Sequence, residues 1–265
     1  MKLLLSISLI AYTFCLQAQK KDVEVYHETQ EDNSIRIFAR NNTAVVQSVK
    51  IEATFKGMKI SDNLPMVKVV EPKESLYFFT LTPEKGSYSY NYRFTYIKGD
   101  VNANHNDDVV YMLPYAKGRT FKIDQGYNEG PTHMNQYALD FHMDTGTEIT
   151  AIRDGIVMDV EEKNSKGCPR EECSKYNNYV MIRHDDGSVA DYSHIMKNGS
   201  KVKIGDRVKA GDPIALSGET GFASGPHLHL EVYVMTFNGQ QSVKVEYHLD
   251  ENTIGIPQSG KTYKN

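Results

Sequence analysis

The sequence predicts an all-β protein in which an N-terminal antiparallel β-sandwich domain is followed by a compact, mainly antiparallel β domain. Three observations lead to this prediction. Apolar and polar residues alternate over short runs, turn-forming residues separate the runs, and the long periodicity of amphipathic helices is nearly absent. Alternation indicates half-buried strands, because successive side chains of a strand point to opposite faces of the sheet.

The amino-terminal residues have the features of a secretory signal. Lys2 precedes an apolar run of about fourteen residues, and Ala18 lies where a signal peptidase would cut. The run is too short to span a bilayer, and no later segment approaches the ~20 consecutive apolar residues of a membrane helix. We therefore expect residues 1–18 to be removed, Cys15 among them, since the aromatic Phe14 argues against lipidation of that cysteine. The mature protein is expected to be exported, periplasmic or extracellular, without a membrane contact.

Residues 22–108 are predicted to form an immunoglobulin-like β-sandwich. Alternating runs within 35–39, 49–55 and 88–96 are typical of strands, and turns separate them at the spacing of an antiparallel sandwich. The run 88–96 has an aromatic residue at every second position. This stripe is either a platform that stacks on glycan or, as is commoner for such patterns, one face of a packed sheet. The segment contains no catalytic cluster.

A polar stretch at 99–108 is predicted to link the sandwich to a second domain over 109–240, with a carboxyl-terminal extension at 241–265. Strand-like runs divided by glycine-bearing turns make the second domain a compact β fold. The clearest of these runs are 148–153, 156–160, 179–184 and 213–217.

The charge and the cysteines exclude several classes of protein. The formal net charge is −4, and removal of residues 1–18 takes away only Lys2, so no polyanion such as nucleic acid is an expected partner. Cys168 and Cys173 remain after export, and in an oxidising compartment they are most simply one disulfide. Two cysteines alone cannot complete a structural zinc site. We expect a monomer.

Two histidines lie on one predicted strand. His227 and His229 follow Gly225 and Pro226 in a run of strand formers, so they share one face of the sheet about 6.5–7 Å apart. Both could bind a metal, one could bind while the other flanks it, or both could be solvated. The spacing alone leaves these alternatives open.

A second element supplies further metal-binding side chains. His133 is followed seven residues later by Asp140, in a loop that runs into an apolar strand, and His194 ends another strand-like run. An imidazole, a carboxylate and one later imidazole make the three-ligand set of a catalytic zinc site, which keeps its fourth position for water.

At this point the sequence resembles the lysostaphin-type zinc endopeptidases of bacterial cell walls. The resemblance spans about 113–234, and several ordered motifs match together, which is more specific than any single motif. The matching segments are His133 to Asp140, Gly146-Thr147, Ala151 to Gly155, Asn178 to Val180 with His184, Tyr192 to His194, Gly205 to Val208 with Gly211, Ser217 to Gly221, and Gly225 to Glu231.

The resemblance implies a role for each matching histidine. His133, Asp140 and His229 would bind one Zn2+ per chain, and His194 and His227 would be catalytic without binding the metal. This chain departs from the family pattern at Asp144, Glu148 and His142, but no ligand is lost. His142 shares a face with Asp140 and is either a spare ligand or a surface histidine. The remaining histidines are expected to be structural or solvated: His27, His105, His184 and His248.

The function implied is hydrolysis of peptide bonds in peptidoglycan, at stem peptides or cross-bridges. A D-amino-acid cross-link is preferred over a glycine bridge as the bond cut. His194 and His227 would exchange protons with water and the leaving amine, although the sequence does not divide these roles. Two alternatives remain: a non-catalytic member of the fold that binds peptidoglycan or activates an amidase, and a sandwich-type adhesion module with an adventitious metal site.

Overall fold

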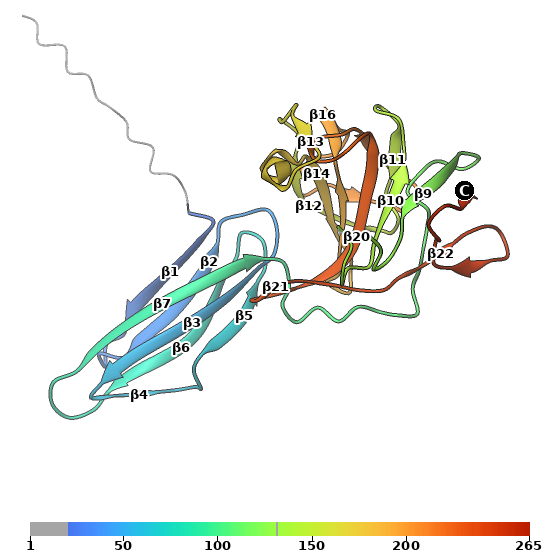
Figure 1. Ribbon diagram of the computed structural model, residues 1–265. Coiled ribbons are helices and arrows are strands. Elements are labelled where there is room, and N and C mark those ends of the chain that lie inside the picture. The colour runs from blue at the N-terminus through green and yellow to red at the C-terminus, as the bar shows by residue number, and fades with distance from the viewer. Residues whose placement is uncertain (1–20, 131) are drawn as a thin grey trace, which may run out of the picture.

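A computed structural model describes residues 21–130 and 132–265, and the expected signal peptide and Cys15 lie outside these ranges. In these ranges the regular secondary structure is almost entirely strand, arranged in mainly antiparallel sheets, so the predicted all-β fold class is confirmed (Figure 1). No helix in the described ranges has the length and apolar character needed to cross a membrane.

The amino-terminal residues form a seven-stranded antiparallel sandwich. One sheet has the order β1-β2-β6-β4 and the other β5-β3-β7. Their inner faces enclose a separate core in which Ile37, Ile51 and Phe79 are fully buried. The strands are β1 Val23–Thr29, β2 Ile35–Asn41, β3 Gln47–Lys56, β4 Met58–Ile60, β5 Met66–Val70, β6 Ser75–Pro83 and β7 Ser89–Lys98.

The aromatic stripe predicted at 88–96 lies mostly on β7. Tyr90, Tyr92 and Phe94 pack against the core of the sandwich, whereas Tyr88 and Tyr96 are exposed at the ends of the run. Three of the five aromatics therefore form one face of a packed sheet, as the structural interpretation of the stripe expects.

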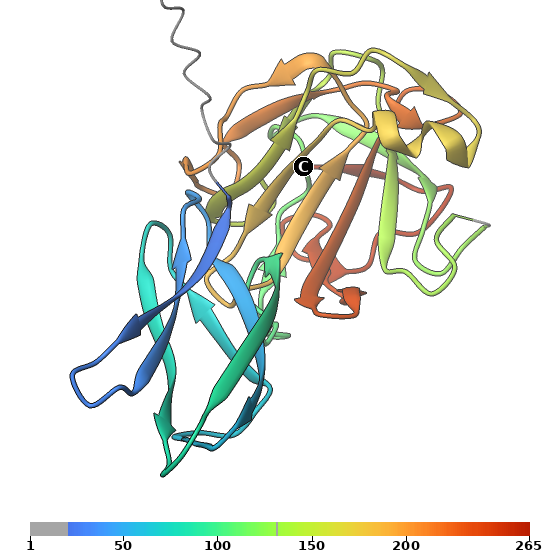
Figure 2. The same cartoon turned by 90° about the vertical axis from the view of Figure 1, so that its left-hand side faces the viewer.

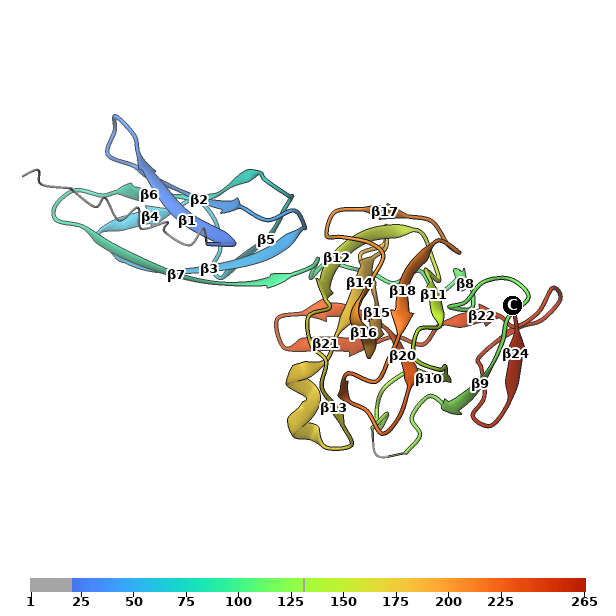
Figure 3. The ribbon, with the colours of Figure 1, turned by 90° about the horizontal axis from the view of Figure 1, so that it is seen from above.

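The second part of the chain is organised around a large sheet with the order β17-β12-β14-β15-β20-β10-β9-β24, in which β21 also pairs with β20. A three-stranded sheet, β11-β18-β16, packs over it (Figure 3). The strands of these sheets are β9 Thr120–Gln125, β10 Ala138–His142, β11 Glu148–Thr150, β12 Gly155–Glu161, β14 Tyr179–Arg183, β15 Val189–Ser193, β16 Ile195–Ser200, β17 Arg207–Val208, β18 Pro213–Ser217, β20 His227–Thr236, β21 Gly239–Ser242 and β24 Thr262–Lys264.

Short elements complete this part of the chain. A 3-10 helix, η1 Glu171–Tyr176, lies beside the parallel pair β13 Gly167–Cys168 and β19 Gly221–Phe222. The carboxyl-terminal residues, set apart above as an extension, pair with earlier strands: β24 with β9, and β22 Glu246–His248 with both β8 Val110–Tyr111 and β23 Ile254–Gly255. The segment 241–265 thus packs into the same core, where Val245 and Tyr247 are buried.

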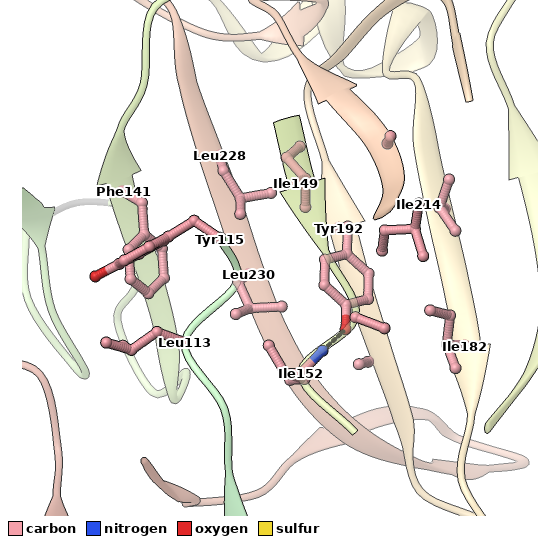
Figure 4. Packing of buried hydrophobic residues seen from close by; sticks show 14 of the residues in the cluster. Leu113, Tyr115, Phe141, Ile149, Ile152, Ile182, Tyr192, Ile214, Leu228 and Leu230 are labelled. Atoms are coloured by element: carbon pink, nitrogen blue, oxygen red, sulfur yellow. Dashed lines mark hydrogen bonds between the residues drawn. The ribbon is translucent and has the colours of Figure 1, made fainter. Parts of the chain in front are cut away.

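The core between the two sheets explains where the functional side chains can lie. Leu228 and Leu230 of β20 point into it beside Phe141 of β10, and the Tyr192 hydroxyl accepts a hydrogen bond of 2.8 Å from the Ile152 amide (Figure 4). Because side chains alternate along a strand, the residues between these apolar ones project from the opposite face. That opposite face carries the candidate metal ligands.

The two parts of the chain meet at the end of β7 (Figure 2). The Lys98 ammonium lies 2.5 Å from a carboxylate oxygen of Asp159 on β12. Val45 packs into a small apolar cluster with Val189 and Tyr233. The predicted linker then runs along the second domain, where the amide of Asn104 donates to a backbone carbonyl of the turn after β14.

Candidate metal centre

Three side chains that are far apart in the sequence converge at one end of the large sheet. Asp140 of β10 lies directly opposite His229 of β20 in the antiparallel register, and His133 reaches them from the loop before β10. His229 Nδ1 is 3.0 Å from Asp140 Oδ1. His133 Nε2 is 3.3 Å from each of these two atoms. The three donor atoms are therefore placed to share one cation.

Hydrogen bonds and burial set the orientation and charge of the three candidate ligands. The His133 ring is buried, and its Nδ1–H donates to the Gly126 carbonyl over 3.0 Å, which leaves Nε2 facing the centre. Burial acts to raise the pKa of Asp140, but hydrogen bonds from the two imidazoles outweigh it and hold that pKa well below its usual range. Burial acts to lower the pKa of His229, and the Asp140 carboxylate outweighs it, so the net shift is upward. The centre thus favours positive charge.

The other two histidines of the prediction lie beside this centre. His194 follows the last residue of β15, and its ring centroid is 4.6 Å from that of His227 at the start of β20. The His194 Nδ1–H donates to the Thr220 carbonyl over 2.7 Å, and the His227 Nδ1–H donates to the Gly225 carbonyl over 2.9 Å. Each ring therefore has its Nε2 free of a backbone partner. His227 Nε2 lies 3.8 Å from Asp140 Oδ1, beyond the spacing of the three candidate ligands.

Burial, together with the neighbouring imidazoles of His227 and His229, lowers the pKa of His194 to about 3. His194 is thus neutral at physiological pH, and its Nε2 carries no proton because Nδ1–H is the donor to the Thr220 carbonyl. Its backbone lies in the left-handed region, with φ of 66°.

One cavity contains all five predicted side chains. It has a volume of about 480 Å³ and opens over the polar face of the large sheet. Besides these five, its walls include Asn177, Asp191, Ser193, Phe222 and Ser224.

The sequence interpretation left out part of this polar face. Asp191 and Ser193 lie on β15, opposite Glu231 and His229. Burial raises the pKa of Asp191 to about 6. The sequence could have predicted this part of the face, because Asp191 and Ser193 are two residues apart on a predicted strand and so share one side of the sheet.

Three of the five remaining histidines have structural partners. His142 is exposed and its Nδ1 lies 2.7 Å from an Asp124 carboxylate oxygen, outside the group of convergent ligands. His184 is buried and its Nδ1–H donates to the Asp154 carbonyl. His105 stacks on Tyr111.

The predicted disulfide between Cys168 and Cys173 is confirmed, with an S–S distance of 2.00 Å. It closes the segment that enters η1, and η1 leads directly to the cavity residue Asn177.

Three potential ligands that converge on one point of a β-sheet domain form a candidate metal centre. Residues 134–244 match the model of Peptidase family M23, so the chain carries a domain of this family, of the lysostaphin type. His133 is the residue immediately before the match.

Two curated relatives illustrate the similarity. The glycyl-glycine endopeptidase ALE-1 of Staphylococcus capitis is 31% identical over 147 residues, which cover 54% of this chain and 36% of that protein. The peptidoglycan DD-endopeptidase ShyC of Vibrio cholerae is 36% identical over 177 residues, which cover 63% of this chain and 36% of that protein. A solved catalytic domain of a prophage-encoded M23 protein from Enterococcus faecalis is 27% identical, with 50% of this chain and 94% of that one covered and a TM-score of 0.38. The chain spans about half or less of the length of the curated relatives it matches.

Proposed function

We propose that this protein is an exported zinc endopeptidase that hydrolyses peptide cross-links of bacterial peptidoglycan. The observation that carries the proposal is the convergence of His133, Asp140 and His229 on one point of a cavity that two further histidines also line. The M23 relatives named above as peptidoglycan and glycyl-glycine endopeptidases support the same reaction class.

Zinc fits the donor set. Zinc bonds of about 2.0–2.2 Å in a tetrahedron hold their ligand atoms about 3.3–3.6 Å apart. The three donor atoms lie 3.0–3.3 Å apart and comprise two imidazole nitrogens and one carboxylate oxygen, which are ordinary zinc ligands. When bound, the ion would supply Lewis acidity that polarises a carbonyl and makes water more acidic.

The protein's own side chains would move the protons. His194 and His227 are not needed as ligands, and their Nδ1 atoms are held by backbone carbonyls. Their Nε2 atoms are therefore left to act in the cavity that both rings line. There one ring can take a proton from water, and the other can give a proton to the leaving amine. The Gly126 carbonyl holds the His133 ring in the orientation that a ligand needs.

The relatives support peptidoglycan peptides as the substrate class, and the two named here differ in the bond that their names specify. We favour a cross-link that contains D-amino acids and joins stem peptides directly. The proposed site of action is the periplasm or the cell exterior, and the proposed working form is a monomer.

Mass spectrometry of products from defined muropeptides tests the proposal. Dimers with a direct D-amino-acid cross-link and dimers with a glycine bridge are incubated with the mature protein, with and without a chelator. We expect chelator-sensitive cleavage of the direct cross-link. Absence of cleavage of both dimers by zinc-loaded protein would reject the endopeptidase function, and cleavage of the glycine bridge alone would reject the preferred bond.

A further inference from the structure

The backbone of His194 has left the sheet at the point where its ring enters the cavity. The pairing of β15 with β14 ends at Ser193 and Tyr179, and His194 takes the left-handed conformation described above. A buried amide without a partner is costly, so its hydrogen bond must come from outside the ladder. The Asn177 side chain provides it: Oδ1 accepts the His194 N–H over 3.1 Å.

Asn177 is itself held from several directions. Its Nδ2 donates to Ser193 Oγ over 2.9 Å, and that hydroxyl donates to an Asp191 carboxylate oxygen over 2.8 Å. Its backbone amide donates to the Ser174 carbonyl at the end of η1. Gly221 packs so closely that a Cβ there would lie 2.8 Å from Asn177 Cα. These contacts leave the carboxamide little freedom to turn.

We propose that Asn177 is a positioning residue for His194. Its amide oxygen fixes the left-handed backbone that points the imidazole at the metal centre, and its amide nitrogen is engaged with Ser193. It acts through His194 instead of contacting the substrate. The role rests on the proposed function for its effect on turnover, but the contact itself can be measured without any substrate.

Two variants of the full-length mature protein separate the acceptor oxygen of Asn177 from the bulk of its side chain, and a third serves as a control. Asn177→Leu keeps the size and loses the acceptor, whereas Asn177→Asp keeps an acceptor oxygen for the His194 amide. We expect kcat for the muropeptide dimer to fall roughly 10- to 100-fold in Asn177→Leu, since small displacements of a reacting group have effects of this size. KM and zinc content should change little. Asn177→Asp should recover most of the lost kcat, and Asn238→Ala, in the exposed turn after β20, is the control for loss of an asparagine.

Hydrogen exchange of the His194 amide, followed by 15N NMR, tests the contact directly. Exchange should be slow in the wild type and in Asn177→Asp, and roughly tenfold or more faster in Asn177→Leu. Unchanged exchange in Asn177→Leu would overturn the proposal, as would equal losses of kcat in the Leu and Asp variants. If the wild type cleaves no muropeptide while the exchange rates differ as expected, the positioning contact stands and the proposed function is wrong.

Discussion

The two histidines of β20 should respond differently to removal, although their sequence context makes them look equivalent. In His229→Ala one of three donor atoms is lost, so zinc affinity and hydrolysis should both collapse. At free zinc of about 100 times the dissociation constant, bound metal stabilises the native state by about 2.7 kcal/mol, and this stabilisation should be lost as well. His227 Nε2 lies outside the triad of candidate ligands, 3.8 Å from Asp140 Oδ1. His227→Ala should therefore keep its zinc.

The expected loss of turnover in His227→Ala is about 10²- to 10⁴-fold, the usual contribution of a general acid or base. At about 1.36 kcal/mol for each factor of ten, this raises the activation barrier by about 2.7–5.4 kcal/mol. Plasma emission analysis gives the zinc content of the folded variants, and melting with and without added zinc gives the stabilisation. His142→Ala is the matched control, because His142 lies opposite His227 in the register but pairs with Asp124. Zinc lost from His227→Ala as completely as from His229→Ala would refute the division of roles, and full zinc and activity in both would place the site elsewhere.

Three further outcomes are expected. A chain that begins near Val109 should still bind zinc, since every candidate ligand follows that residue. A folded but metal-free product would contradict the domain assignment, and turnover equal to that of the full-length protein would show that the sandwich does not restrict access to the cavity. Reduction of the Cys168–Cys173 disulfide should lower the free energy of unfolding by only roughly 2 kcal/mol, because the loop is short, and should leave zinc in place. An intact mass that shows two free thiols in exported protein would reject the bond. Burial lowers the pKa of His184 to about 4, whereas the unfolded imidazole titrates near 6.5, so the unfolded chain binds more protons between these values. The free energy of unfolding should therefore fall as pH drops from about 6.5 to 4, by at most ~1.4 kcal/mol per unit from this group, and urea titrations of His184→Gln should show a shallower fall.

Local patterns predicted the fold class because alternation and turns are properties of neighbouring residues. The same period of two placed His227 and His229 on one face of a strand, which the structure shows on β20. The grouping of the ligands came from the family resemblance, since Asp140 and His229 meet only through a pairing register between strands 89 residues apart. No local pattern sets that register.

Other features depend on contacts that the sequence does not reveal. Left-handed backbone is most common at glycine, so the residue type of His194 did not predict this conformation. The Asn177 carboxamide that supports it comes from a different turn. The segment 241–265 looked like an extension because its strands are very short. These strands are stable only beside β8 and β9, to which Tyr247 and Tyr263 bring buried or half-buried rings.

The contact between the two domains has a consequence for how the protein could be held in place. Tyr233 and Met235 pack in the apolar cluster that includes Val45 of the sandwich, four and six residues beyond the candidate ligand His229 on β20. At about 3.3 Å per residue, this junction lies ~13–20 Å along the strand from the metal centre. A protein held through its sandwich would therefore present the cavity on the side away from the attachment, and the length of the attachment would set how far the cavity can reach.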